Sequence, residues 1–250
     1  MASVRPPEGA RIVAPPFPRG LPWFNVSMLR MDQQRGRPVL VEFWDFCRVN
    51  SLRTLPYLRA WHERYEDDGL RVVGIHSAGF PPSQQPDAVE AAVQRLEVPY
   101  PVIVDLHMEL WELYGNRGWP GRYLWDREGL LSYYHYGEGA YQETERAIAE
   151  MLGLDPDPVA PVRPEDAPDL LLPAQTADQE GAYSGPYEGG GAWAVLDGHG
   201  VVRANAAQIA VDGPGCYPLV EHERHTHGEL SLEIGEGVTC YATCFTPGLP

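Results

Sequence analysis

The sequence contains few cysteines, few basic residues and no long apolar run. Only four of its 250 residues are cysteines, and none belongs to a Cys-x-x-Cys pair, which excludes a zinc site built on such a pair. Lysine and arginine total 19 against 35 acidic residues, and the net charge of −16 argues against nucleic-acid or anionic-membrane binding. No apolar run approaches the roughly 20 residues that a membrane-spanning helix needs.

The first residues also lack the apolar core of a secretory signal. Residues 1–18 are rich in proline and arginine, so we expect no signal peptide and a cytoplasmic location. Thiols in that compartment are reduced by default, and a disulfide framework is not expected. The hydrophobic content of 44% is ordinary for one large or two modest globular domains.

Composition divides the chain into four parts. Residues 1–20 carry five prolines and predict an extended arm, and residues 154–180 form a proline-rich linker. Between them, residues 21–153 alternate strand-like and helix-like patterns. Residues 181–250 consist of short strand-like runs separated by Gly, Pro or Asp, which indicate a small all-β domain of the sandwich or jelly-roll type.

The first large domain begins with the pattern of a βαβ unit. The apolar run 38–44 predicts a strand buried on both faces, apolar spacing over 52–65 predicts an amphipathic helix, and residues 70–76 predict the next strand. Such a unit places its two strands parallel. A strand at 101–105 and further strands and helices up to residue 152 complete an α/β domain.

One cysteine lies where the first strand passes into the helix. Cys47 follows Trp44 by three residues and precedes the helical spacing. Backbone N–H groups at a helix N-terminus and the nearby Arg48 and Arg53 favour a thiolate. Cys47 is therefore a candidate nucleophile. The alternative is a buried thiol that packs as a small hydrophobe.

Several stretches of this domain follow the order and spacing of a known family. They are Val41–Trp44, Asn50-x-x-Arg53 to Leu58, Val73–Ser77, Tyr100–Val102, Gly118–Pro120, Asp126-x-x-Gly129 and His135–Tyr141. Together they resemble the thioredoxin-like family of TlpA type, in particular the redoxin domain of DipZ-type proteins. The resemblance implies a thioredoxin-like fold and a thiol or disulfide substrate, a peptide among the options.

The resemblance also locates active-site positions. The two cysteines of the family would fall at Arg48 and Ser51, whereas a one-residue shift puts Cys47 in the place of the nucleophile. Without a second cysteine in the motif, a mixed disulfide on Cys47 needs a thiol from elsewhere. Glu42 matches the acidic residue implied to accept a proton, although a hydrogen-bonded structural carboxylate is equally consistent. Pro120 matches the usually cis proline that faces a substrate.

A second group of candidates lies in the β-rich part. His225 and His227 are two residues apart and project from one side of a strand, where His222, Cys240 or Cys244 would complete a transition-metal site. The alternative is a polar hairpin with solvated imidazoles. If Cys240 and Cys244 share a strand, they face the same side ~13 Å apart, beyond disulfide reach.

Three functions follow from these patterns. The first is a thiol-disulfide oxidoreductase or thiol peroxidase that acts through one cysteine and needs no cofactor. Its site would contain Cys47, Glu42, Arg48, Ser51, Arg53 and Pro120. The second is a non-catalytic thioredoxin-fold binding module that has lost its dithiol. The third is a metal-handling protein that uses the C-terminal histidines and cysteines.

Overall fold

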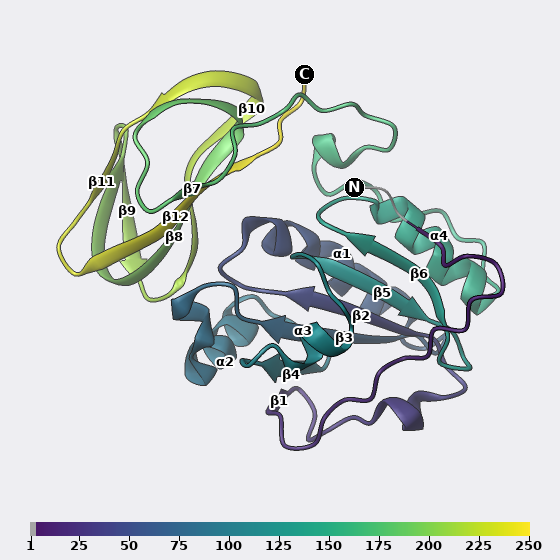
Figure 1. The fold of residues 1–250 in the computed structure, drawn as a ribbon. Coiled ribbons are helices and arrows are strands. Elements are labelled where there is room, and N and C mark those ends of the chain that lie inside the picture. The colour runs from purple at the N-terminus through teal and green to yellow at the C-terminus, as the bar shows by residue number, and fades with distance from the viewer. Residues whose placement is uncertain (1–3) are drawn as a thin grey trace. The chain divides into compact units, whose positions relative to one another are not determined.

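The computed structural model describes residues 4–250, which divide into two compact units (Figure 1). The first unit contains the chain up to Asp45 and residues 50–78 and 84–162. The second contains residues 163–250 together with two short segments, 46–49 and 79–83.

A six-stranded mixed sheet forms the centre of the first unit, in the order β1-β4-β3-β2-β5-β6. Its strands are β1 (Trp23–Phe24), β2 (Val39–Trp44), β3 (Arg71–Ser77), β4 (Val102–Asp105), β5 (Gly121–Trp125) and β6 (Leu131–Tyr136). β2 is parallel to β3 and β3 to β4, whereas β1, β5 and β6 pair antiparallel with their neighbours. The predicted βαβ unit is therefore confirmed.

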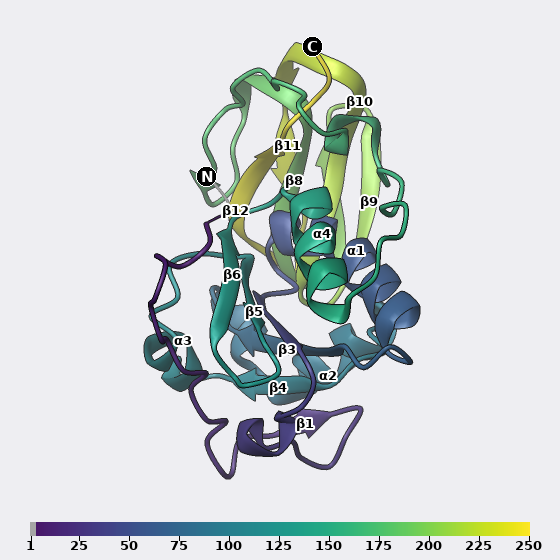
Figure 2. The ribbon, with the colours of Figure 1, turned by 90° about the vertical axis from the view of Figure 1, so that its right-hand side faces the viewer.

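Helices cover both faces of this sheet. They are α1 (Val49–Tyr65), α2 (Pro86–Arg95), α3 (Glu109–Leu113) and α4 (Tyr141–Leu152). Tyr57 of α1 stacks on Tyr141 of α4 with ring centroids 3.7 Å apart, so these helices share one face, and Figure 2 shows them side by side. On the other face, Trp111 of α3 and Tyr114, which directly follows this helix, pack beside Phe43. Every residue of β2 is buried because both faces are covered.

The N-terminal arm follows the edge strand of the sheet. Val4 and Val13 form single antiparallel bridges to Tyr134 and Leu130. Residues 1–3 of the predicted arm lie outside the described residues. At the other end of the domain, α4 ends at Leu152 and is followed by Gly153, whose φ of +75° is the left-handed conformation that glycine adopts without strain.

The second unit is an antiparallel all-β structure. Its strands are β7 (Gln179–Glu180), β8 (Gly185–Ala204), β9 (Ala207–Asp212), β10 (Gly215–Leu230), β11 (Leu232–Ile234) and β12 (Val238–Thr246). β8 is the organising strand, because β9, β10, β11 and β12 all pair with it. The predicted order of an α/β thioredoxin-like domain followed by an all-β region is confirmed. Among the described residues, no helix has the length and apolar character needed to cross a bilayer.

The length of β8 differs from the sequence prediction. We expected short strands separated by Gly, Pro or Asp, but β8 runs unbroken for 20 residues, through the three glycines at 189–191. Glycine serves close packing here rather than a turn, since a Cβ on Gly190 would lie 2.1 Å from the carbonyl oxygen of Pro247. Inside the unit, Leu196, Val202 and Phe245 belong to one buried apolar cluster.

Asp105 ties the end of β4 to the start of α3. This buried carboxylate accepts hydrogen bonds from the backbone N–H groups of Leu110 and Trp111, each at 3.0 Å. It also accepts the hydroxyl of Ser77, the last residue of β3, at 2.8 Å. One side chain thus satisfies helix-start donors and links two parallel strands.

Replacing Asp105 with alanine therefore leaves two buried donors and one partly buried donor without an acceptor. We expect Asp105→Ala to lower the free energy of unfolding by about 3 kcal/mol, measured by urea denaturation. The exposed Asp67 offers a matched control, and Asp67→Ala is expected to change it by less than about 0.5 kcal/mol. Equal effects of the two variants would contradict this role.

Candidate functional site

Cys47 lies between β2, which ends at Trp44, and α1, which begins at Val49. Its side chain is fully buried and its thiol is not in a disulfide. The neighbouring Arg48 places its guanidinium 4.7 Å from the centroid of the Phe80 ring. Cys47 and Arg48 belong to the second unit, whereas the other predicted site residues of the redoxin motif belong to the first.

Two of those residues begin α1. Ser51 accepts a hydrogen bond from the backbone N–H of Asp45 at 3.3 Å, which joins the end of β2 to the first helical turn. Arg53 donates from Nε to the carboxylate of Glu138 at 2.5 Å, with both side chains largely buried. The charge of Arg53 is thus balanced by a carboxylate within the first unit.

The predicted proline lies in the loop that precedes β5. The Trp119–Pro120 peptide bond is cis, and Pro120 is buried. The indole Nε1 of Trp119 donates a 2.8 Å hydrogen bond to the carbonyl oxygen of Ser77. The Trp119 ring also lies 4.1 Å from that of Trp111, so the loop is packed onto β3 and α3.

Glu42 forms a buried ion pair that the sequence prediction missed. It lies directly opposite Arg122 in the β2–β5 register, and Arg122 Nε is 2.9 Å from Glu42 Oε2. Both side chains are fully buried. Burial raises the pKa of Glu42, and the positive charge of Arg122 offsets part of that rise. The sequence contained one signal for this pair: β2 and β5 each carry a single charged residue, Glu42 and Arg122.

Arg122 is held from the side of α1 and α4 as well. Its Nη1 donates to the hydroxyl of Thr144 at 2.8 Å. The guanidinium lies 5.3 Å from the Trp61 ring and 5.7 Å from the Tyr141 ring, within the range of cation–π attraction. These partners offset part of the cost of burying the charge, although Arg122 Nη2 and Glu42 Oε1 have no hydrogen-bond partner within residues 4–250.

His135 extends this row of groups to a third strand. It lies opposite Arg122 in the β5–β6 register, so Glu42, Arg122 and His135 follow one another across β2, β5 and β6. Burial and the charge of Arg122 lower the pKa of His135 from 6.5 to about 4. The imidazole is therefore neutral at pH 7. We name Glu42, Arg122 and His135 the buried charge row.

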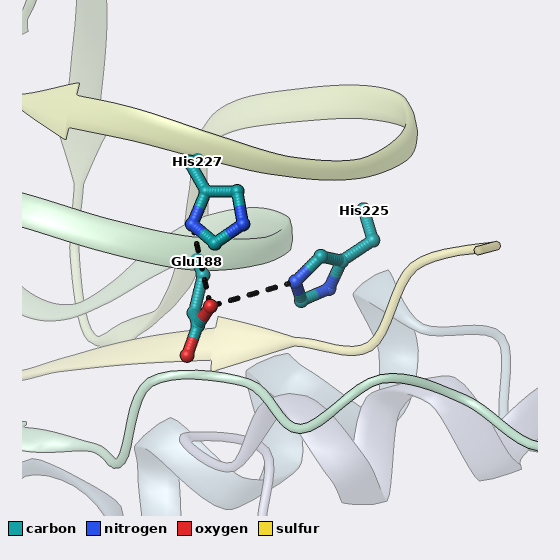
Figure 3. Close-up of side chains that lie close together, drawn as sticks. All are labelled: Glu188, His225 and His227. Carbon is teal, nitrogen blue, oxygen red and sulfur yellow. Dashed lines mark ion pairs between the residues drawn. The ribbon is translucent and has the colours of Figure 1, made fainter.

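The C-terminal histidines separate into two groups. His222 Nε2 lies 2.7 Å from the hydroxyl of Tyr187. His225 and His227 instead approach Glu188, which the sequence prediction had not included, at 3.8 and 3.3 Å (Figure 3). Within residues 4–250, the group of possible metal ligands consists of these three residues. Neither His222 nor a cysteine belongs to it.

The two C-terminal cysteines do not face the same side of their strand, contrary to the sequence expectation. Both lie on β12, but a bulge between Cys240 and Ala242 shifts the register by one residue. Cys240 lies opposite Leu196 and packs against the apolar cluster of the second unit, whereas Cys244 lies opposite Trp193. The extra residue reverses the alternation of side chains. Burial raises the pKa of both thiols, which makes them poor metal ligands.

Removing the cation of the buried charge row leaves a carboxylate buried without its partner. We expect Arg122→Met to lower the free energy of unfolding by about 3–5 kcal/mol, and the double variant Glu42→Leu with Arg122→Met to recover most of that loss. Chemical denaturation measures both. Arg5 pairs with Glu150 at the surface, and Arg5→Met is expected to cost less than about 1 kcal/mol. A loss as small in Arg122→Met would contradict this assignment.

The lowered pKa of His135 predicts how stability depends on pH. Because the folded state binds this proton less readily than the unfolded state, the contribution of neutral His135 is complete above pH 6.5 and is lost as the pH falls toward 4. The loss amounts to roughly 3 kcal/mol. We expect His135→Gln to flatten the pH profile of the unfolding free energy in this window, and the exposed His107→Gln to leave it unchanged.

Comparison with known proteins identifies relatives of the first unit. The family model described as AhpC/TSA family matches residues 22–134. Protein DipZ of Mycobacterium tuberculosis is 32% identical over 180 residues, which cover 68% of this chain and 26% of DipZ. The chain thus spans about a quarter of the length of that relative.

Shorter relatives and solved structures agree with this match. Thiol-disulfide oxidoreductase YkuV of Bacillus subtilis is 22% identical over 130 residues, 52% of this chain and 87% of YkuV. A thiol-disulfide isomerase from Corynebacterium glutamicum has the same fold, with a TM-score of 0.51 at 21% identity over 57% of this chain and 98% of that chain. Residues 22–134 therefore form a thioredoxin-like redoxin domain of the AhpC/TSA type, related to DipZ and to thiol-disulfide oxidoreductases.

Proposed function

We propose that this protein is a thiol redox protein and that Cys47 Sγ is its reacting atom. The observation that carries the proposal is the position of Cys47 between the central strand β2 and the start of α1 in a redoxin domain. A relative that spans this domain is named a thiol-disulfide oxidoreductase, which supports a thiol or disulfide substrate. Helix N-termini favour the thiolate that such chemistry needs.

Reaction with a disulfide requires two exchange steps. The Cys47 thiolate attacks one sulfur of the substrate disulfide, forms a mixed disulfide and releases the other sulfur as a thiolate. A second thiol, deprotonated, then attacks the substrate sulfur of the mixed disulfide, so that Cys47 leaves as a thiolate. Because Ser51 cannot supply this second thiol, it comes from outside the motif.

The same thiolate supports a peroxidase variant. Attack on a peroxide oxygen cleaves the O–O bond, gives the sulfenic acid of Cys47 and releases an alkoxide or hydroxide, which takes up a proton. A thiol then condenses with the sulfenic acid, forming a disulfide and water. In either reaction, Glu42 is proposed to accept the proton that the Cys47 thiol loses, and in the peroxidase variant to return it to the released alkoxide or hydroxide, because burial keeps its pKa above the ordinary value.

A second candidate function is supported by separate observations. Arg48 and Ser51 occupy the positions at which the resemblance places two cysteines, and Cys47 is fully buried. A redoxin domain with these features is suited to bind a thiol-bearing or peptide partner without turnover. The redox proposal, in contrast, requires residues 46–49 to open during each cycle.

The experiment compares turnover by the 250-residue protein with turnover by variants in which one cysteine is replaced by serine. Reduction of a small aromatic disulfide and of hydrogen peroxide is followed with excess dithiothreitol, and rates are corrected for the reaction without protein. We expect Cys47→Ser to lower both protein-dependent rates at least about 100-fold, since the thiolate is the nucleophile in each. Cys216→Ser, which changes a partly exposed thiol, is expected to retain activity.

Each result distinguishes the two functions. Turnover that disappears in Cys47→Ser, with unchanged far-ultraviolet circular dichroism, supports the redox protein. Wild-type protein without turnover, or turnover equal in wild type and Cys47→Ser, would overturn that proposal and favour the binding module.

A further inference from the structure

We propose that Glu188, His225 and His227 form a binding site for a divalent transition-metal ion, with Zn²⁺ as the best match. The site lies entirely within the second unit and is independent of the redox proposal. Two imidazoles and one carboxylate form a donor set that suits zinc and related ions rather than Mg²⁺ or Ca²⁺.

The pairing of two strands brings these residues together. His227 of β10 lies directly opposite Glu188 of β8, and His225 precedes His227 by two residues. Directly opposed side chains in an antiparallel pair are close neighbours, and residues two apart on a strand tend to face the same side. Figure 3 shows both imidazoles directed toward the Glu188 carboxylate.

The distances suit a single ion. Glu188 Oε2 lies 3.3 Å from His227 Nδ1 and 3.8 Å from His225 Nε2, and the three ligand atoms all lie within 4.8 Å of one another. Bonds of 2.0–2.2 Å in a tetrahedron place neighbouring ligand atoms about 3.3–3.6 Å apart. Shifts of a few tenths of an ångström to about an ångström in the side chains bring all three atoms to an ion at their centre.

Hydrogen bonding without an ion leaves His225 poorly satisfied. Its side chain is only 10% exposed, and its Nδ1 is buried with no hydrogen-bond partner among the described residues. At 3.8 Å, its Nε2 is beyond hydrogen-bond distance of Glu188. The unpartnered atom is Nδ1, which an ion at Nε2 does not satisfy. The separation of Nε2 from Glu188, too long for a hydrogen bond, leaves the Nε2 lone pair available to an ion when Nδ1 carries the proton.

The ion would keep an open coordination position. Glu188 and His227 line a surface pocket of about 630 Å³, and the His227 side chain is 82% exposed. This pocket provides a route by which the ion enters and room for water as a further ligand. Three protein ligands with an open position distinguish the site from closed structural zinc sites, which have four.

The test is a calorimetric titration of the 250-residue protein with Zn²⁺ and, in parallel, with Mg²⁺. Before the titration, a chelator removes bound metal and dialysis removes the chelator. We expect one Zn²⁺ per chain and no Mg²⁺ binding. Glu188→Gln and His227→Asn change side chains with exposed surface and are each expected to weaken Zn²⁺ binding more than about 10-fold. His225→Asn should do the same.

Two controls separate this site from general surface binding. Glu229 lies two residues beyond His227 and lines the same pocket, but it is not among the three ligands. His199 is exposed elsewhere on β8. We expect Glu229→Gln and His199→Asn to change the affinity less than about 2-fold. The thermal unfolding midpoint of each variant shows whether that variant folds. We expect Zn²⁺ to raise this midpoint in the wild type and in the two controls only.

Absence of saturable one-to-one Zn²⁺ binding by the wild type would overturn the proposal. So would equal binding by a folded variant that combines Glu188→Gln with His227→Asn. In either case, the three side chains form an ordinary imidazole–carboxylate contact.

Discussion

The ion pair between Glu42 and Arg122 is the constraint on which the redoxin domain depends. It places two full charges at the centre of a sheet whose neighbouring residues are apolar, and both side chains are sealed from solvent. Such charges are stable only as a pair, and here part of the cost of burial is unrelieved, since Glu42 Oε1 and Arg122 Nη2 have no hydrogen-bond partner among the described residues. The register of β2 against β5, the position of Thr144 and the rings of Trp61 and Tyr141 therefore have to be correct together.

The pair also links the layers of the domain. β2 supplies the carboxylate, β5 the guanidinium, and α4 both the hydroxyl that accepts from Arg122 and the Tyr141 ring beside it. His135 on β6 remains neutral because the adjacent cation opposes its protonation. A change in one member thus alters the charge state or the packing of the others. For this reason we treat the three residues of the buried charge row together.

The sequence predicted the strands and helices of the first domain well, because their signals are local. Apolar runs identified β2 and β3, and the helical spacing over 52–65 lies within α1. Arg122 was missed as the partner of Glu42 because the two lie 80 positions apart and meet only through strand register. Glu188 was missed for the same reason. The bulge between Cys240 and Ala242 was missed because no residue type there indicates a bulge.

Glycine misled the prediction of the second domain. In short strands it usually marks a break, yet Gly190 lies inside β8 because another backbone passes too close for a side chain. Sequence alone does not separate these two uses of the residue. The His225–His227 spacing, in contrast, correctly indicated neighbouring imidazoles, since both lie on β10. What the spacing omitted was the carboxylate beside them, Glu188, which the paired strand β8 supplies.

The buried charge row also bears on the two candidate functions of the first domain. If Glu42 and Arg122 served only to hold the fold, apolar residues of similar volume would do as well, since buried ion pairs are often no more stabilising than such replacements. Apolar residues cannot exchange a proton, however, whereas Glu42 combines a raised pKa with a place in the strand that leads to Cys47. The proposed exchange of a proton between Cys47 and Glu42 would therefore give the raised pKa of this buried acid a role that an apolar residue could not fill.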